Sequence, residues 1–259
     1  MPPEIIWAII ASSVGVAGSV WGLLAFYAHR SNLEAETRRR FIMTSGICLL
    51  GWLVLAAVLG TNGIFQATPS RAFPTLLVSI ALLLTVGTFL LYRSSMVNAV
   101  LATIPLPWLM GVQMYRAVGF IFLLLYVQGR LPGEFALPAG WGDVAIGLAA
   151  PVVAYIFHKR YRWSCLAAWS WNVIGILDIA VAVSTGFLSS PSPYQTLALE
   201  TPNTLITVFP LVLVPLVAVP LSILLHVAAL KRLSAARQTG SHRGLKCDGK
   251  TLCWTGSLP

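Results

Sequence analysis

The chain has 259 residues, of which 57% belong to the hydrophobic set and only 10% are charged. A soluble domain averages about 45–50% apolar and about 25% charged residues, so this composition excludes a water-soluble globular protein. The formal net charge of +9 does not indicate nucleic-acid binding, because the basic residues lie at the ends of apolar runs and form no stripe interleaved with aromatic side chains.

Seven apolar runs are long enough to cross a bilayer. A helix needs roughly 20 apolar residues to span a hydrocarbon core of about 30 Å, and it satisfies its own backbone hydrogen bonds there. The predicted fold is therefore all-α, a polytopic transmembrane helix bundle of seven spans that occupies residues 1–233. In chain order, the predicted spans are 5–27, 41–59, 74–91, 109–127, 137–157, 164–187 and 205–230.

Two regions depart from a simple span. Residues 96–108 include the break Ile104-Pro105-Leu106-Pro107, and we interpret them as an interfacial or re-entrant segment. In the seventh span Pro210, Pro215 and Pro220 each remove a backbone donor, which predicts a bent or locally unwound helix.

The basic residues of the connections predict the orientation. With an external amino terminus, fourteen Lys and Arg residues fall on the cytoplasmic side and only Arg71 and Arg130 on the other. Cytoplasmic connections carry such an excess, so we predict an external amino terminus, a cytoplasmic carboxyl terminus and insertion in the cytoplasmic (plasma) membrane. The start Met1-Pro2-Pro3-Glu4 lacks a basic region before the first apolar run, which predicts no cleaved signal peptide. The polar stretch 234–259 is predicted to be a disordered cytoplasmic tail.

Three ionisable residues lie inside predicted spans: Arg116, Asp143 and Asp178. A charge there costs about 2.5–3.5 kcal/mol on insertion scales, so each needs a partner or a water-filled cavity. At a rise of about 1.5 Å per residue, Arg116 and Asp178 both lie roughly 14–16 Å below the external boundary, which makes an ion pair possible. Asp143 is shallower and could join the pair from the outer side.

Neighbouring residues extend this group into a predicted polar pocket. Gln113 shares a helical face with Arg116, and Asn172 lies on the broad face of Asp178. A stripe of small residues, Gly140, Gly147 and Ala150, flanks Asp143 and predicts close packing against another helix. We expect the pocket to open outward through residues 129–142. Its predicted lining, as a ligand site or ion pathway, is Gln113, Arg116, Asp143, Asn172 and Asp178.

Structural alternatives stand beside this interpretation. A buried Arg–Asp pair can fix helix register alone, and a carboxylate near a helix start, such as Asp143, is favoured by the helix dipole. His29, His158 and His226 are placed at the cytoplasmic ends of spans, where interfacial polar residues are routine. The cysteines Cys48, Cys165, Cys247 and Cys253 lack the spacing of a zinc site, so neither metal nor cofactor is predicted.

Three segments carry a resemblance. Gly129-Arg130-Leu131-Pro132, Phe135-Ala136-Leu137-Pro138-Ala139-Gly140 with Gly142-Asp143, and Trp171-Asn172 with Gly175 and Asp178 are similar to segments of small uncharacterised bacterial multi-pass membrane proteins. The similarity covers about residues 115–230. It implies a membrane protein without an assigned activity and supplies no catalytic residue. No lysine lies within a predicted span, which excludes a retinal Schiff base.

We therefore predict a multi-pass integral membrane protein that binds or transports a small polar or ionic solute. Its expected partners are the lipid bilayer and that solute, with no nucleic acid. One alternative is a membrane sensor or assembly partner without transport. A membrane-embedded enzyme acting on lipid or quinone-like substrates is disfavoured, because the sequence has no paired His/Asp or metal-ligand cluster. The sequence predicts no catalytic residue and leaves the oligomeric state open.

Overall fold

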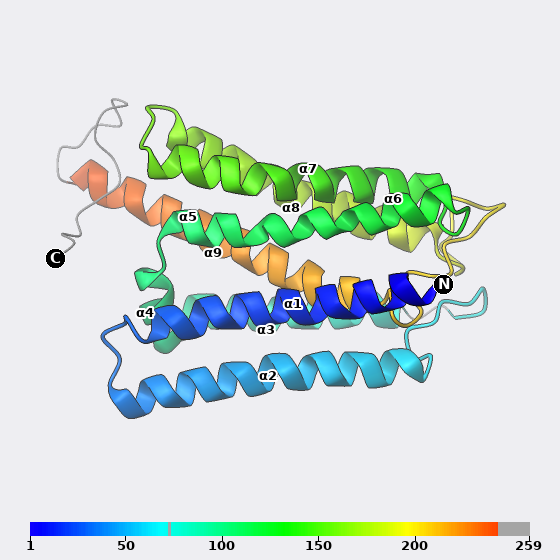
Figure 1. The fold of residues 1–259 in the computed structure, drawn as a ribbon, viewed down its shortest axis with the longest axis horizontal. Helices are drawn as coiled ribbons and strands as arrows, with labels where there is room; N and C mark the ends of the chain where they lie inside the picture. The colour runs from blue at the N-terminus through cyan, green and yellow to red at the C-terminus, as the bar shows by residue number, and fades with distance from the viewer. Residues whose placement is uncertain (72–73, 243–259) are drawn as a thin grey trace.

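The computed structural model describes residues 1–71 and 74–242, and this part of the chain is helical without strands (Figure 1). Its helices run roughly side by side along one axis. In chain order they are α1 (Pro3–Ala28), α2 (Ala35–Thr61), α3 (Thr75–Arg93), α4 (Ser95–Thr103), α5 (Leu106–Gly111), η1 (Val112–Gly119), α6 (Phe120–Val127), α7 (Gly133–His158), α8 (Ser164–Ser189), η2 (Val214–Ala218) and α9 (Val219–His242).

Seven stretches of the described chain are long and apolar enough to cross a membrane, and they match the seven predicted spans one to one. Five of these stretches are single helices. The fourth, Leu106–Val127, joins α5, the 3-10 segment η1 and α6. The seventh, Val214–Ala235, joins the π-helical segment η2 to most of α9. The all-α prediction with seven long apolar helices is confirmed.

The predicted start of the seventh span at residue 205 is wrong. Turns and bends occupy this region up to residue 212, and the helical stretch begins at Val214. The chain then stays helical to His242, past position 234 where the predicted tail begins. The rest of that tail, 243–259, with Cys247 and Cys253, lies outside the described residues.

The prolines explain the irregular start of this helix. In an α-helix the carbonyl of Leu211 would accept from residue 215 and that of Leu216 from residue 220, but both positions are proline and have no N–H. The Leu211 carbonyl accepts instead from the N–H of Val214 at 3.0 Å. The Leu216 carbonyl accepts from the indole Nε1 of Trp52 on α2 at 2.8 Å. The predicted local unwinding is confirmed, and a neighbouring helix satisfies one of the freed groups.

The segment predicted to be interfacial or re-entrant is the short helix α4, at the end of the bundle where α3 ends (Figure 1). Ser94 caps it by accepting from the N–H of Val97 at 3.3 Å. Cations from α9 bind the carbonyls at these helix ends. Lys231 donates to the carbonyl of Leu91 and to Asn98, each at 2.6 Å, and Arg232 donates to the carbonyl of Ile104.

The outside of the bundle is apolar. On α2 the exposed fractions of Ile47 and Leu50 are 65% and 63%, and Phe89 on α3 and Leu177 on α8 are likewise exposed. Monomeric soluble proteins rarely expose contiguous apolar surface on this scale. Buried apolar side chains lie between the helices instead, in three clusters, the first of which connects α1, α7, α8 and α9.

Candidate functional site

Arg116 lies at the centre of the bundle, on the 3-10 segment η1, and its side chain is 2% exposed. Its Nη2 is 2.7 Å from Oδ1 of Asp143 on α7 and also contacts Oδ2 of Asp178 on α8. Its Nε donates to Oδ1 of Asp143 at 2.9 Å. Nη1 lies 3.3 Å from both the carbonyl oxygen of Gly175 and Nε2 of His226. These five contacts match the five N–H donors of a guanidinium.

The ion pair predicted from matching depth is therefore present, and Asp143 joins it as expected. Three separate elements supply its charged groups, which makes it a tertiary contact. The stripe of small residues on α7 explains how they come together. A Cβ at position 147 would overlap the backbone of Ala117, so Gly147 lets α7 and η1 approach closely one turn from Asp143.

His226 of α9 belongs to the same cluster, and its prediction as an interfacial residue is wrong. The side chain is fully buried, with its ring 5.0 Å from the ring of Trp171. Nδ1 lies 2.9 Å from Oδ1 of Asn172 and 3.2 Å from Nε2 of Gln113. Because a guanidinium can only donate, Nε2 of His226 must be the acceptor toward Arg116, which indicates a neutral ring protonated at Nδ1.

Two features of the sequence could have indicated His226. Counting the seventh span from residue 205 put this histidine near its end, whereas in the helical stretch Val214–Ala235 it is near the middle. Gly175 is the second signal, because it lies between Asn172 and Asp178 on α8. A Cβ there would overlap the imidazole, so the glycine makes room for the ring.

A second polar contact lies beside the cluster. The hydroxyls of Tyr115 on η1 and Ser222 on α9 are 2.8 Å apart, and Ser222 is one turn before His226. Within the described chain, Oε1 of the fully buried Gln113 has no hydrogen-bond partner. Buried polar groups are normally paired, and a His226 ring protonated at Nδ1 would donate to this oxygen if the amide of Gln113 were turned to exchange its O and N atoms.

The charges of the cluster do not balance. One guanidinium faces two carboxylates, and the hydrogen bonds of His226 give it no charge. With both carboxylates ionised, the cluster carries one excess negative charge inside an apolar bundle, where an uncompensated charge is costly. Asp143 is the more accessible of the two carboxylates, with 21% of its side chain exposed against 14% for Asp178. Its Oδ1 takes both contacts from Arg116, and no described residue donates a hydrogen bond to its Oδ2.

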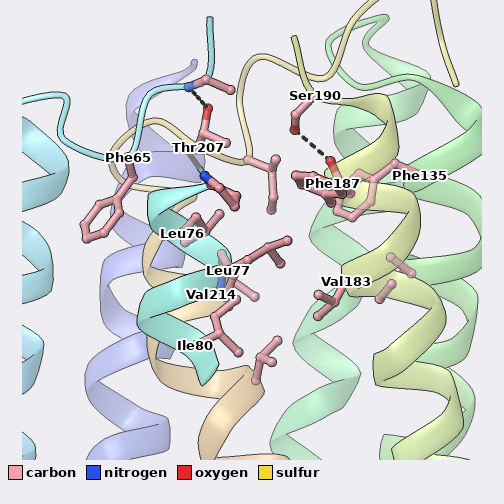
Figure 2. Close-up of a pocket in the computed structure, with 18 of the residues that line it drawn as sticks. Phe65, Leu76, Leu77, Ile80, Phe135, Val183, Phe187, Ser190, Thr207 and Val214 are labelled. Atoms are coloured by element: carbon pink, nitrogen blue, oxygen red, sulfur yellow. Dashed lines mark hydrogen bonds between the residues drawn. The ribbon is translucent and has the colours of Figure 1, made fainter. Parts of the chain in front are cut away.

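Two pockets meet at Asp143. The larger encloses about 930 Å³, open space at its mouth included, and lies between α3 and α8 (Figure 2). The smaller encloses about 590 Å³ between α1, η1 and the start of α9. Asp143 lines both of them, together with Phe122, Ile179, Val214 and Val219.

The predicted lining and opening of the pocket need correction. Gln113 and Asn172 are fully buried in close packing, and with Asp178 they line neither of these pockets. Arg116 lines the smaller pocket but not the larger one. The mouth of the larger pocket is formed by residues of the connections after α2 and after α8, among them Phe65, Arg71 and Tyr194, whereas the predicted opening, 129–142, contributes only Phe135 and Ala139 to its lining. Gln113 and Asn172 contact His226, and Asp178 contacts Arg116, so these three side chains are paired within the cluster instead of lining a pocket.

The fold and the cluster together define an all-helical protein with seven apolar helices of membrane-spanning length around a buried ionic network. Residues 73–234 match the family described as Domain of unknown function (DUF8737). The match covers more than half of the chain, so the chain belongs to this family. It includes every residue of the cluster, while α1 and α2 lie outside it. No curated protein and no solved structure matches the chain.

Proposed function

We propose that this chain is a multi-pass protein of the cytoplasmic membrane with its amino terminus outside. Seven apolar helices and an apolar outer surface support insertion in lipid. The distribution of cations supports the orientation. Arg30, Arg93, Lys159 and Lys231 lie at one end of the bundle, whereas Arg71 and Arg130 lie in connections at the opposite end, beside the amino terminus (Figure 1).

Within this bundle the protein binds a small solute that carries positive charge, at the carboxylates that face Arg116. The observation that carries this proposal is the charge imbalance, one guanidinium for two carboxylates, at the point where two pockets meet. A metal ion or an organic ammonium group at Oδ2 of Asp143 would neutralise the excess charge. Intramembrane acids of this kind mark ion and proton pathways in membrane proteins.

Passage of the solute would use both pockets. The larger one leads from the end of the bundle that carries the amino terminus to Asp143, and the smaller one continues beyond it toward Tyr115 and Ser222. These two hydroxyls are 2.8 Å apart, and both residues line the smaller pocket. In a transport cycle we expect this contact to open while Asp143 holds the solute.

Binding can be tested on the purified full chain in detergent. We expect one or more of the chlorides of sodium, potassium and methylammonium to raise the unfolding temperature saturably, at constant ionic strength and at several pH values. Asp143→Asn should abolish the increase, because the amide leaves the cluster neutral. Glu134→Gln removes an exposed acid from the same helix and should retain it. An increase that survives Asp143→Asn, or none with any cation at any pH, contradicts the proposal.

A second candidate function is a membrane sensor or assembly partner without transport. The close packing of Gln113, Asn172 and His226, each fully buried, favours it, because these residues have the character of a structural staple. Co-purification of a stoichiometric protein partner, with no cation-dependent stabilisation, would support this candidate over solute binding.

A further inference from the structure

The larger pocket is lined mainly by apolar side chains, which a small hydrated ion does not need for binding. Its walls are apolar, with Leu76, Leu77 and Ile80 of α3 facing Val183 and Phe187 of α8 (Figure 2). Sites for organic ligands are typically concave and lined mainly by apolar side chains with a few polar groups, and the lining of this pocket has that character. An inorganic cation would cross this pocket without its water shell being replaced.

The charged groups of the pocket lie at opposite ends. Asp143 lies inside the bundle on α7, where it lines the pocket together with Ile80 and Ile179, and its Oδ2 is without a donor among the described residues. Arg71 is at the mouth, where its Nη1 donates to the carbonyl oxygens of Ile64 and Gln66 at 2.8 and 3.1 Å. The group with an unsatisfied charge is therefore the half-buried carboxylate of Asp143, because the exposed arginine already binds carbonyls and is open to solvent.

We propose that the larger pocket binds an apolar organic molecule that carries one cationic group, with the cation at Asp143 and the apolar body between α3 and α8. This inference rests on the proposed function, since it assigns the chemical class of the cation that Asp143 takes. The complementarity is twofold. The apolar walls match the body of the ligand, and the excess negative charge of the cluster matches its cationic end. Aromatic side chains of the walls, Phe122 and Phe135 among them, also favour a cation.

Tetraphenylphosphonium and tetraphenylborate test this directly, because they have nearly the same shape and opposite charge. Binding is measured by equilibrium dialysis with the purified full chain at a fixed detergent concentration. We expect saturable binding of tetraphenylphosphonium that tetraphenylborate does not displace. Asp143→Asn should weaken it by about tenfold or more, the effect of losing one interaction with a charged group.

Two matched variants test the location. Val183→Trp fills the pocket from α8 and should reduce binding of tetraphenylphosphonium by at least about tenfold. Val181→Trp makes the same change two residues earlier, at a side chain that is 48% exposed and does not line the pocket, and should leave binding unchanged. Gel filtration of each variant establishes that it is folded before binding is compared.

Several outcomes overturn the inference: equal binding of tetraphenylborate, equal effects of the two tryptophan variants, or binding that ignores Asp143→Asn. Binding of tetraphenylborate that Arg71→Ala abolishes would instead identify a ligand with an anionic head at the mouth. If methylammonium stabilises the protein through Asp143 and tetraphenylphosphonium does not bind, the inference fails and the proposed function stands. If neither cation depends on Asp143, both fail.

Discussion

Arg116 contacts two carboxylates, a backbone carbonyl and an imidazole nitrogen, so its removal leaves several buried groups without a donor at once. Removing the charge of one carboxylate has a different effect from removing Arg116. If either Asp143 or Asp178 is neutralised, the other still balances the guanidinium. The two kinds of substitution at this cluster should therefore have unequal effects on stability.

We expect Arg116→Leu to destabilise the protein by about 3–5 kcal/mol, the usual effect of removing one partner from a buried ion pair. Asp143→Asn and Asp178→Asn should each cost less than about 2 kcal/mol, because a balanced pair remains. Thermal unfolding of the purified variants in detergent measures the order. Arg130→Leu, at an exposed arginine, is the control and should change little. Equal losses for Arg116→Leu and either Asn variant would show that the cluster has no excess charge.

At the scale of single residues, the sequence predicted a contact correctly where the distance of each residue from the end of its span was enough to decide it. Arg116 and Asp178 were paired by counting residues from span ends, and they meet. His226 was misplaced because its depth depended on where the seventh helix begins, and the prolines move that start to Val214. The solid packing around Gln113 and Asn172 could not be predicted either, since it depends on how four helices fit together.

Helices in this bundle are held at close range by glycines that face the polar cluster. A Cβ at position 142 would overlap the carboxylate of Asp178, and one at position 175 would overlap His226. At position 147 the obstacle would be the backbone of Ala117, which cannot move like a side chain. The 3-10 segment η1, which carries Arg116, is thus positioned by backbone contact with α7 as well as by the ion pair.

Gly147→Ala should destabilise the protein by about 1–3 kcal/mol, the typical cost of overpacking, because the methyl group pushes η1 away from α7. Gly51→Ala on α2 is the matched control, since its Cβ would meet no atom within 4 Å. There the change should be neutral or slightly stabilising, because alanine favours a helix over glycine by about 0.5–1 kcal/mol. Unfolding temperatures in detergent compare the two variants. Similar losses for both would mean that the contact between α7 and η1 is not tight.

At the scale of the element, the length of the apolar runs predicted the seven long helices of the described chain, and proline positions predicted the unwinding near η2. No such signal predicted the 3-10 geometry of η1. Its sequence contains no proline, and the only helix-weakening residues near it are Gly111, just before the segment, and Gly119, its last residue. Trp52 is a similar case. Its hydrogen bond to the Leu216 carbonyl joins residues from α2 and η2, and no local pattern links them.

The whole molecule separates into a segment that holds the cluster and two helices that complete its surroundings. The family match, 73–234, contains every charged group of the cluster, whereas α1 supplies Ile9 and Ser13 to the wall of the smaller pocket. Phe65 and Arg71, which precede the match, form part of the mouth of the larger one. The cluster is thus built within the family segment, and the pockets beside it are lined in part by α1 and by the connection after α2.

The orientation of the whole bundle decides which side would supply the proposed ligand, and cysteine labelling can measure it. Starting from a chain in which Cys48, Cys165, Cys247 and Cys253 are replaced by alanine, single cysteines are placed at two exposed positions at opposite ends of the bundle, Glu34→Cys and Thr201→Cys.

A membrane-impermeant maleimide should label Thr201→Cys in intact cells, because the connection between α8 and η2 lies on the predicted outer side with Arg71 and Arg130. Glu34→Cys, in the connection before the arginines at 38–40, should react only after the cells are opened. Labelling of both residues in opened cells is the control for accessibility. The reverse pattern in intact cells would invert the bundle, so that the mouth of the larger pocket would face the cytoplasm and the ligand would come from inside the cell.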